Sequence, residues 1–576
     1  MNSNQNPKKL RSQRWFGGTP MDAEHTAHAL QAGLGREEFE GKPVIGIINT
    51  WSDLNPCHAH LRERAEAVKR GVWQAGGYPV ELPAMSLGEG YLKPSAMLYR
   101  NMLAMQTEEM LRAQPVDGAI LLGGCDKTTP GLLLGAISAD LPAIFCPAGF
   151  ANSARYRGES FGSGTGPFRW APELIAGRLP VSEWQTIEEK IWSSPGTCNV
   201  MGTASTMTAL AEVMGFSLPG ASSVPATASK GHQLAAAAGR RIVDMVWEDL
   251  RPSQILTRGA IENAVKVNVA LGGSTNAAIH LIALARRAGH DFTLQQFDAL
   301  ARGVPVLANV QPSGQHLMHE FADAGGLPAL LLQLQSVLDT EQRTILGETM
   351  AAVIGRARVD DAEVIRPLDN PVATEALAVV SGNLAPKGAV IKPSAATPAL
   401  MKHRGRALVF EDAADMAARI HSDDLEVTVD SVLVLRNCGP QGGPGMAENG
   451  MLPIPKKLAE QGVRDVLRLS DARMSGTSFG TCVLHISPES WIGGPLALVQ
   501  TGDEIELNVA ERSLNLLVDE AQLAERRAAW IAPKPHYVRG WGSLFVEHVN
   551  GADEGCDFDF LVRPGETPEP PIHGKL

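Results

Sequence analysis

The order of hydrophobic periodicities constrains the fold of this chain more than any other feature of the sequence. Helical spacing at residues 58–75 and 95–111 alternates with short apolar runs at residues 44–48, 79–82, 119–122 and 143–145, and helical patterns dominate from residue 201 to about 355. Strands that alternate with helices in this way form a parallel sheet covered by helices on both faces. The sequence therefore predicts a doubly wound α/β fold for the first two-thirds of the chain.

The period shifts toward two after a break between residues 356 and 380, where Pro367, Asp369 and Pro371 are turn signals. β-rich runs follow at residues 432–435, 466–469, 505–509 and 514–518. Residues 510–512 fit a short hairpin loop between the last two runs. We predict two domains, an α/β domain over residues 1–375 and a mostly β domain over residues 376–576.

The composition excludes several classes of protein. The 576 residues are 44% apolar and 20% charged, and without an internal repeat or a low-complexity tract the chain is neither fibrous nor disordered. A formal net charge of −12 argues against a general nucleic-acid binder. No apolar run approaches the ~18 residues that span a bilayer, and no apolar signal-peptide stretch follows the basic residues near the start. We expect a cytoplasmic protein that binds neither nucleic acid nor a membrane.

Three of the seven cysteines lie where an open α/β sheet forms its ligand crevice. The set is odd in number and sparse, which does not suit a disulfide framework. Cys57 and Cys198 precede helical segments, and Cys125 directly follows a predicted strand. Their wide separation excludes the local clusters of zinc ribbons and ferredoxins. Three thiolates from separate loops could hold an iron–sulfur cluster with one iron left open, whereas the alternative for each cysteine is a buried small hydrophobe.

Acidic residues and one serine lie in similar loops. Glu89 follows a predicted strand, Asp126 adjoins Cys125, and Glu448 ends a glycine-rich stretch. Oxygen ligands scattered over loops suit Mg²⁺, although each residue taken alone is more consistent with a solvated loop carboxylate. Ser475 precedes a glycine shortly after a predicted strand. It can present its hydroxyl to a pocket, or it can be an ordinary turn serine.

Residues 158–162 match the G-x-S-x-G motif of serine hydrolases around Ser160. That motif needs a strand before it and a helix after it. The glycine-rich residues 162–167 follow, and we expect no helix to begin promptly there. The same run lacks the spacing of a dinucleotide-binding fingerprint. We therefore reject both functions.

Several longer stretches together resemble the dihydroxy-acid and 6-phosphogluconate dehydratase family, which includes aldonic-acid dehydratases. They occur in the family's order from about residue 40 to residue 500. The matching stretches are Asn55-Pro56-Cys57, Gly124-Cys125-Asp126-Lys127-Thr128-Thr129-Pro130, Gly196-Thr197-Cys198-Asn199, Met201-Gly202-Thr203-Ala204-Ser205-Thr206, Leu271-Gly272-Gly273-Ser274-Thr275-Asn276, Asn383-Leu384-Ala385-Pro386-Lys387-Gly388 and Ser470-Asp471-Ala472-Arg473-Met474-Ser475-Gly476-Thr477.

The resemblance implies a hydro-lyase with an α/β N-terminal domain and a β-barrel-like C-terminal domain. It also implies that a [2Fe–2S] cluster, or a [4Fe–4S] cluster as in some relatives, is held by Cys57, Cys125 and Cys198. An iron with an open position is a Lewis acid that can hold the departing C3 hydroxyl of a polyhydroxy acid. Cys438 and Cys482 lie near matching stretches but are not family ligands, and we expect them to be structural.

The resemblance further implies a Mg²⁺ ion held by Glu89, Asp126 and Glu448, with Lys127 carbamylated so that it supplies another oxygen ligand. An unmodified lysine would place a positive charge in a cation site. Ser475 would be the base, and it can take the C2 proton only as an alkoxide whose pKa is lowered by adjacent cations. Loss of water then gives an enol that tautomerises to a 2-keto acid.

Within the family, three stretches are similar to the sugar-acid branch, and they imply an aldonate substrate such as L-arabinonate, D-xylonate or a hexonate. We expect a homodimer or homotetramer. His548, in the tail, is a candidate substrate contact across a subunit interface, and its alternative is a surface histidine. Residues 146–149, Cys-Pro-Ala-Gly, depart from the Gly-Gly-Pro-Met that is frequent in relatives, which affects the expected pocket wall. The three stretches are residues 9–15, 49–53 and 551–561.

Two alternatives remain open from the sequence. One is a 2,3-dihydroxy-acid dehydratase of branched-chain amino-acid biosynthesis, or an enzyme that serves both substrate classes, although those enzymes usually carry an aspartate where this chain has Glu89. The other is a catalytically idle member that responds to iron or redox state. The presence of Ser475 and of all three cysteines and acidic ligands argues against an idle protein.

Overall fold

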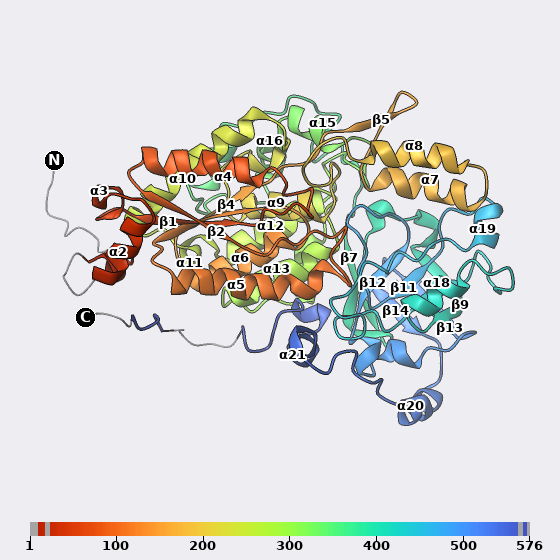
Figure 1. Ribbon diagram of the computed structural model, residues 1–576. Helices are drawn as coiled ribbons and strands as arrows, with labels where there is room; N and C mark the ends of the chain where they lie inside the picture. The colour runs from red at the N-terminus through yellow and green to blue at the C-terminus, as the bar shows by residue number, and fades with distance from the viewer. Residues whose placement is uncertain (1–9, 18–22, 563–567, 573–576) are drawn as a thin grey trace.

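A four-stranded parallel sheet forms the centre of the first part of the molecule. The structure, a computed structural model, describes residues 10–17, 23–562 and 568–572 (Figure 1); Lys9, in the stretch at residues 9–15, lies outside them. The strand order is β2-β1-β3-β4, and all neighbours are parallel. The strands are β1 (Val44–Asn49), β2 (Tyr78–Pro83), β3 (Gly118–Gly123) and β4 (Ala143–Pro147).

Helices cover both faces of this sheet because its side chains are apolar on both. Ile45 and Ile120 pack on one face under α4 (Leu61–Gln74) and α10 (Ser229–Glu248). Ile48 and Phe145 pack on the other face under α5 (Arg100–Ala113), α6 (Thr128–Ala139) and α9 (Thr203–Val213). Strands buried on both faces read as continuous apolar runs. The predicted doubly wound α/β architecture is confirmed.

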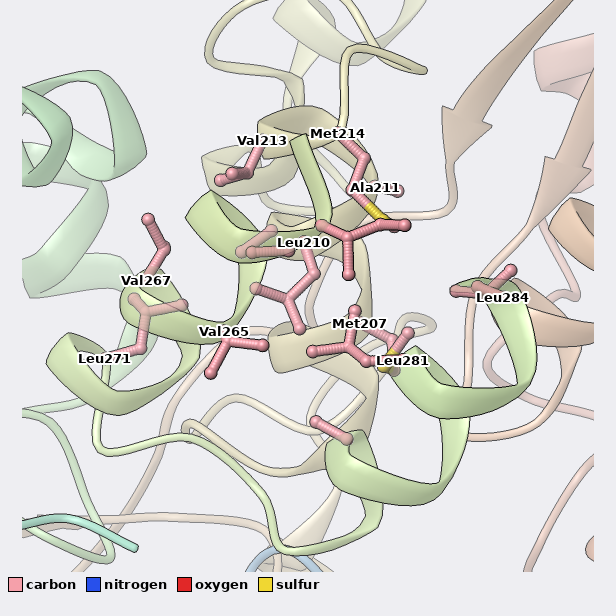
Figure 2. Packing of buried hydrophobic residues seen from close by; sticks show 14 of the residues in the cluster. Met207, Leu210, Ala211, Val213, Met214, Val265, Val267, Leu271, Leu281 and Leu284 are labelled. Atoms are coloured by element: carbon pink, nitrogen blue, oxygen red, sulfur yellow. The ribbon is translucent and has the colours of Figure 1, made fainter. Parts of the chain in front are cut away.

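A cluster of helices extends the second of these cores. Figure 2 shows Met207 and Leu210 of α9 packed toward Val265 of α12 (Arg258–Ala270) and Leu281 of α13 (Asn276–Arg287). α9 is buried along its whole length, so its N-terminus is held firmly in the interior.

The second part is a closed, mixed β-barrel of eight strands in the order β10-β11-β12-β8-β7-β14-β13-β9. Apolar side chains such as Val380, Val434 and Ile505 fill its interior. The barrel-like prediction is confirmed, and β13 and β14 form the expected antiparallel hairpin. The strands are β7 (Ala378–Gly382), β8 (Ala385–Ile391), β9 (Lys402–Phe410), β10 (Val432–Leu435), β11 (Arg468–Ser470), β12 (Cys482–Ser487), β13 (Glu504–Asn508) and β14 (Ser513–Leu516).

The expectation that no helix begins after residues 162–167 is wrong. α7 (Thr165–Ile175) begins inside that run and is followed by α8 (Val181–Ile191). Pro167 lies in the first turn of α7, where its missing N–H costs no helical hydrogen bond, and Trp170 packs edge-on against Phe161 at 5.2 Å between ring centroids. Ser160 is exposed within strand β6 (Glu159–Phe161), which pairs with β5 (Ala154–Tyr156). It does not lie at a turn between a strand and a helix, so the rejection of a hydrolase stands on this geometry.

The C-terminal segment leaves the barrel and returns to the first part of the molecule. Phe545 of α21 (Gly540–His548) and Phe558 pack with Leu98 and Ile279. The domain boundary at residue 375 stays a prediction. Among the described residues, no helix combines the length and the apolar character needed to cross a membrane. The remaining α-helices are α1 (Gln13–Phe16), α2 (Ala23–Gln31), α3 (Arg36–Phe39), α11 (Pro252–Ile255), α14 (Leu294–Ala301), α15 (Met318–Asp323), α16 (Gly326–Leu334), α17 (Met350–Ile354), α18 (Ala413–Arg419), α19 (Lys456–Glu460) and α20 (Glu520–Ala529).

Candidate active site

The loops that follow β1, β2 and β3 meet at the carboxyl edge of the parallel sheet, where α/β proteins form their ligand sites. Gly124 lies at the end of β3, and a Cβ there would come 2.8 Å from the Cβ of Ala148 and 2.9 Å from the side chain of Thr197. The absence of a side chain therefore lets three loops approach one another. The Gly124 N–H donates to His58 Nε2 at 3.0 Å, which ties the loop of Cys57 to that of Cys125.

The structure brings Cys57, Cys125 and Cys198 together from three separate loops. A hydrogen bond with Cys125, then burial, and then the charges of Cys125 and Cys198 raise the pKa of Cys57 well above its ordinary value. Burial, followed by Asp126 and Cys125, raises the pKa of Cys198. Cys125 adopts a left-handed backbone with φ of 63°. Three clustered thiols are a donor set that a metal would deprotonate, so these residues fit an iron–sulfur cluster.

Glu89, Asp126 and Glu448 also converge, each offering an oxygen, with these atoms within 4.8 Å of one another. Among the described residues, Oε2 of Glu89 is buried without a hydrogen-bond partner. A buried carboxylate oxygen without a hydrogen bond is costly, and a divalent cation would satisfy it. Hard oxygen donors in this number are those that Mg²⁺ takes. The three carboxylates therefore fit a Mg²⁺ site, and the charge that Asp126 exerts on Cys198 joins this site to the thiols.

Two buried cations lie among the carboxylates. Lys127 Nζ is 3.3 Å from Asp126 Oδ2 and 3.7 Å from Glu89 Oε2. The Arg473 guanidinium donates to Glu89 Oε1 at 2.8 Å and also contacts Glu448 Oε1. Burial favours the neutral form of Glu89, but Arg473 and Lys127 outweigh it and lower its pKa to about 2. Burial raises the pKa of Glu448 to about 7. The positive charge of Arg473 opposes this shift, and the negative charge of Glu89 adds to it.

Ser475 lies two residues beyond Arg473 in a half-buried turn. Its Oγ is 3.0 Å from Thr477 Oγ1. The next residue, Gly476, packs on the N-terminus of α9 so closely that a Cβ there would lie 2.4 Å from Thr203 N. The positive end of a buried helix stabilises a nearby negative charge. The turn thus brings the backbone next to Ser475 to the positive end of α9.

His548 pairs within the C-terminal segment. Its Nδ1 lies 3.0 Å from Asp559 Oδ1, and its ring meets Phe560 edge-on at 5.1 Å between centroids. These contacts do not join it to the three clustered thiols or to Glu89, Asp126 and Glu448. Its role as a substrate contact stays a prediction.

Sequence reasoning assigned no role to Arg473 or to His58, although both lie in or beside matching stretches. Arg473 is fully buried between two acidic side chains. His58 is fully buried too, and burial lowers its pKa to about 4, so that a neutral ring accepts the Gly124 N–H. The sequence could have indicated a role for Arg473 because it lies in the same matching stretch as Ser475. Its acidic partners could not be identified, because they lie far from it along the chain.

Comparison with known proteins agrees with this arrangement. The model of the dihydroxy-acid/6-phosphogluconate dehydratase N-terminal region matches residues 42–353, and that of the C-terminal region matches residues 363–556. The chain belongs to the dihydroxy-acid/6-phosphogluconate dehydratase family. The predicted family and its hydro-lyase class are confirmed.

Relatives within the dihydroxy-acid/6-phosphogluconate dehydratase family match over nearly their full length. The chain is 53% identical to a 6-deoxy-6-sulfo-D-gluconate dehydratase of Pseudomonas putida, over 98% of this chain and 99% of the relative. It is 48% identical to an L-arabinonate dehydratase of Rhizobium leguminosarum bv. trifolii, over 96% of each chain. A dihydroxy-acid dehydratase of Ignicoccus hospitalis is 40% identical, over 94% of this chain and 98% of the relative.

Replacing Arg473 by methionine will destabilise the protein, because Glu89 and Glu448 then lose the guanidinium between them. Removing one partner of a buried ion pair costs about 3–5 kcal/mol. Arg404→Met is the control, since Arg404 pairs with Glu504 in an exposed position on the barrel, and such a pair contributes about 0–1 kcal/mol. The measurement is the shift in the urea midpoint of unfolding. Equal shifts for the two variants would contradict the importance of the buried pair.

Proposed function

We propose that this protein is a sugar-acid dehydratase, which converts an aldonate to a 2-keto-3-deoxy acid and water. The observation that carries the proposal is the convergence of three thiols and three carboxylates, from distant segments, at one edge of the sheet. The substrate class is supported by the identity to the sulfogluconate and arabinonate dehydratases over almost the whole chain. These thiols and carboxylates do not form the serine-hydrolase or the dinucleotide-binding motif that we tested against the sequence.

We assign the cofactors by donor type. Cys57, Cys125 and Cys198 would hold the iron–sulfur cluster, as [2Fe–2S] with [4Fe–4S] as the alternative. Glu89, Asp126 and Glu448 would hold Mg²⁺. When bound, the cluster supplies a Lewis acid for the C3 hydroxyl, and Mg²⁺ neutralises the substrate carboxylate and the charge that develops on it.

Lys127 would join the magnesium ligands as a carbamate. Its ammonium now lies against Asp126 and Glu89, so an unmodified lysine competes with a cation for these oxygens. Addition of carbon dioxide to the neutral amine forms an N–C bond, releases a proton and leaves an anionic oxygen ligand in its place. The side chain is fully buried, which keeps bulk water away from the modified nitrogen.

Ser475 would take the proton from C2 of the substrate. A neutral serine is too weak for this step, so the proton of its own hydroxyl must leave first. Two features favour the alkoxide: the N-terminus of α9, which packs on the adjacent Gly476, and the Thr477 hydroxyl 3.0 Å from Ser475 Oγ. The C2 proton passes to the Ser475 alkoxide, and the C3 hydroxyl leaves as hydroxide. The hydroxide takes that proton from Ser475 Oγ to become water, which restores the alkoxide, and the enol tautomerises to the 2-keto acid.

A substrate panel tests the proposed function. Anaerobically purified, iron-loaded protein with Mg²⁺ is assayed for 2-keto acid formation from pentonates, hexonates including a 6-sulfo hexonate, D-glycerate and 2,3-dihydroxyisovalerate. We expect the fastest turnover on a pentonate or hexonate. Faster turnover on 2,3-dihydroxyisovalerate would instead favour the branched-chain amino-acid function. An intact cluster with no turnover on any acid would favour an idle family member.

Serine substitution of Cys57, Cys125 or Cys198 will remove the cluster. A hard hydroxyl is a poor ligand for iron in such clusters, so we expect loss of visible absorbance and of bound iron in each variant. Cys438→Ser and Cys482→Ser are matched controls, since both thiols are buried elsewhere. Retained absorbance in any of the first three variants would remove that cysteine from the ligand set.

Ser475→Ala will leave the cluster absorbance intact and abolish most of the turnover. Loss of a general base lowers kcat by about 10²–10⁴-fold. Ser513→Ala, on barrel strand β14, is the control and keeps its activity. If Ser475→Ala turns over at the wild-type rate with an intact cluster, another group must take the C2 proton.

A further inference from the structure

The proposed magnesium ligand Glu448 lies at the end of a glycine-rich loop. Residues 437–448, here called the glycine loop, lie between β10 and α19 and contain four glycines and two prolines. Glycine is the residue with the greatest backbone freedom in the unfolded chain. Backbone hydrogen bonds within the loop join residues 439–446, and contacts from outside the loop fix where it lies.

Glu489 holds the middle of the glycine loop. Its carboxylate is buried, and it accepts the Gln441 N–H at 2.9 Å and the Gly442 N–H at 2.9 Å. Gly439 lies so close that a Cβ there would come 2.5 Å from Glu489 Oε2. The loop is thus wrapped around one carboxylate, and a glycine at this position permits the approach. From the other side, His536 Nε2 lies 2.8 Å from the carbonyl oxygen of Gly442.

Asp471 holds the start of the same loop. It is fully buried, and it accepts the Cys438 N–H at 3.0 Å and the N–H of Ser490 at 2.9 Å. The Ser490 hydroxyl donates to Asp471 at 2.5 Å and accepts the Asn437 N–H at 2.7 Å. Asp471 stands two residues before Arg473 and four before Ser475. One carboxylate therefore links the turn of the proposed base to the loop of the proposed metal ligand.

We propose that Glu489 and Asp471 are positioning residues, which fix the glycine loop so that Glu448 reaches the site of Glu89, Asp126 and Arg473. The proposal rests on the proposed function, because it takes Glu448 as a Mg²⁺ ligand. Carboxylates that hydrogen-bond a metal ligand typically change metal affinity 10–100-fold when they are lost, and Glu489 and Asp471 bind the backbone of the loop that carries the ligand.

The electrostatics of the pair support a role beyond stability. Burial and then the charge of Asp471 raise the pKa of Glu489 to about 8, and burial raises the pKa of Asp471. Two buried acidic groups near each other are an unfavourable way to stabilise a loop. Glu489 accepts the successive N–H groups of Gln441 and Gly442, and Asp471 accepts the N–H of Cys438. These directed hydrogen bonds fix the path of the loop as neutral packing would not.

Glu489→Gln tests the proposal, with Mg²⁺ affinity as the readout. Holoprotein freed of divalent cations by anaerobic gel filtration is titrated with MgCl₂ in a calorimeter, and cluster absorbance and the unfolding midpoint are recorded beside it. We expect the Kd for Mg²⁺ to rise at least tenfold while the cluster absorbance is unchanged. Ser490→Ala, a milder change on the same network, should raise the Kd by a smaller factor.

Glu212→Gln is the matched control. Glu212, in the last turn of α9, is also buried and accepts two loop N–H groups, from Gly220 at 2.6 Å and Ser222 at 2.9 Å. We expect this variant to lower the unfolding midpoint and to leave the Kd for Mg²⁺ unchanged. The comparison separates the loss of a buried loop carboxylate in general from the loss of one that positions Glu448.

Glu448→Gln serves as the reference for the proposed ligand set. If it weakens Mg²⁺ binding while Glu489→Gln and Ser490→Ala do not, the positioning role is wrong and the proposed metal site stands. If Glu448→Gln itself leaves the Kd unchanged, the ligand role of Glu448 is wrong and the positioning role falls with it. Weaker binding in Glu448→Gln and Glu489→Gln, but not in Glu212→Gln, supports both.

Discussion

The buried guanidinium of Arg473 is the contact on which the candidate site depends. It belongs to the second part of the chain, yet it lies between Glu89, which follows a strand of the sheet, and Glu448, which follows a strand of the barrel. Its ion pairs are buried, so the loss of either partner leaves an uncompensated charge in the interior. The two parts of the molecule are therefore joined by the same charges that form the site.

The rest of the site follows from placing loops at the edge of a parallel sheet. The strands bring Cys57, Glu89 and Cys125 to one edge because all of them run in the same direction. α9, buried along its length, brings its N-terminus to the turn of Ser475. Glycines at Gly124 and Gly476 allow backbone approaches that any larger residue would prevent. The chemistry of the site thus depends on close backbone packing as much as on the reactive side chains.

The sequence predicts much of this architecture where a local pattern exists. The apolar runs of β1 and β3 are buried on both faces and were visible as runs. β9 was not visible as an apolar run. Residues 402–406 are exposed or half-buried and mostly basic, and only the second half of the strand is apolar and buried. The thiols and carboxylates could be proposed because they lie in loops beside predicted strands or helices, and because the resemblance to the family implies these ligand sets. Arg473, Asp471 and Glu489 could not, because a buried polar contact between distant segments leaves no periodicity in either one.

The charges of the site also explain why the proposed carbamate and the proposed Mg²⁺ belong together. Three carboxylates face two cations, Lys127 and Arg473, which leaves one negative charge in excess, and Glu448 with its raised pKa is where a proton would offset it. Turning the Lys127 ammonium into a carbamate makes the site more negative by two charges, and a divalent cation restores the balance. A buried site tolerates neither change alone, since each leaves uncompensated charge. The two events therefore favour each other, as any two ligands with a positive coupling free energy must do.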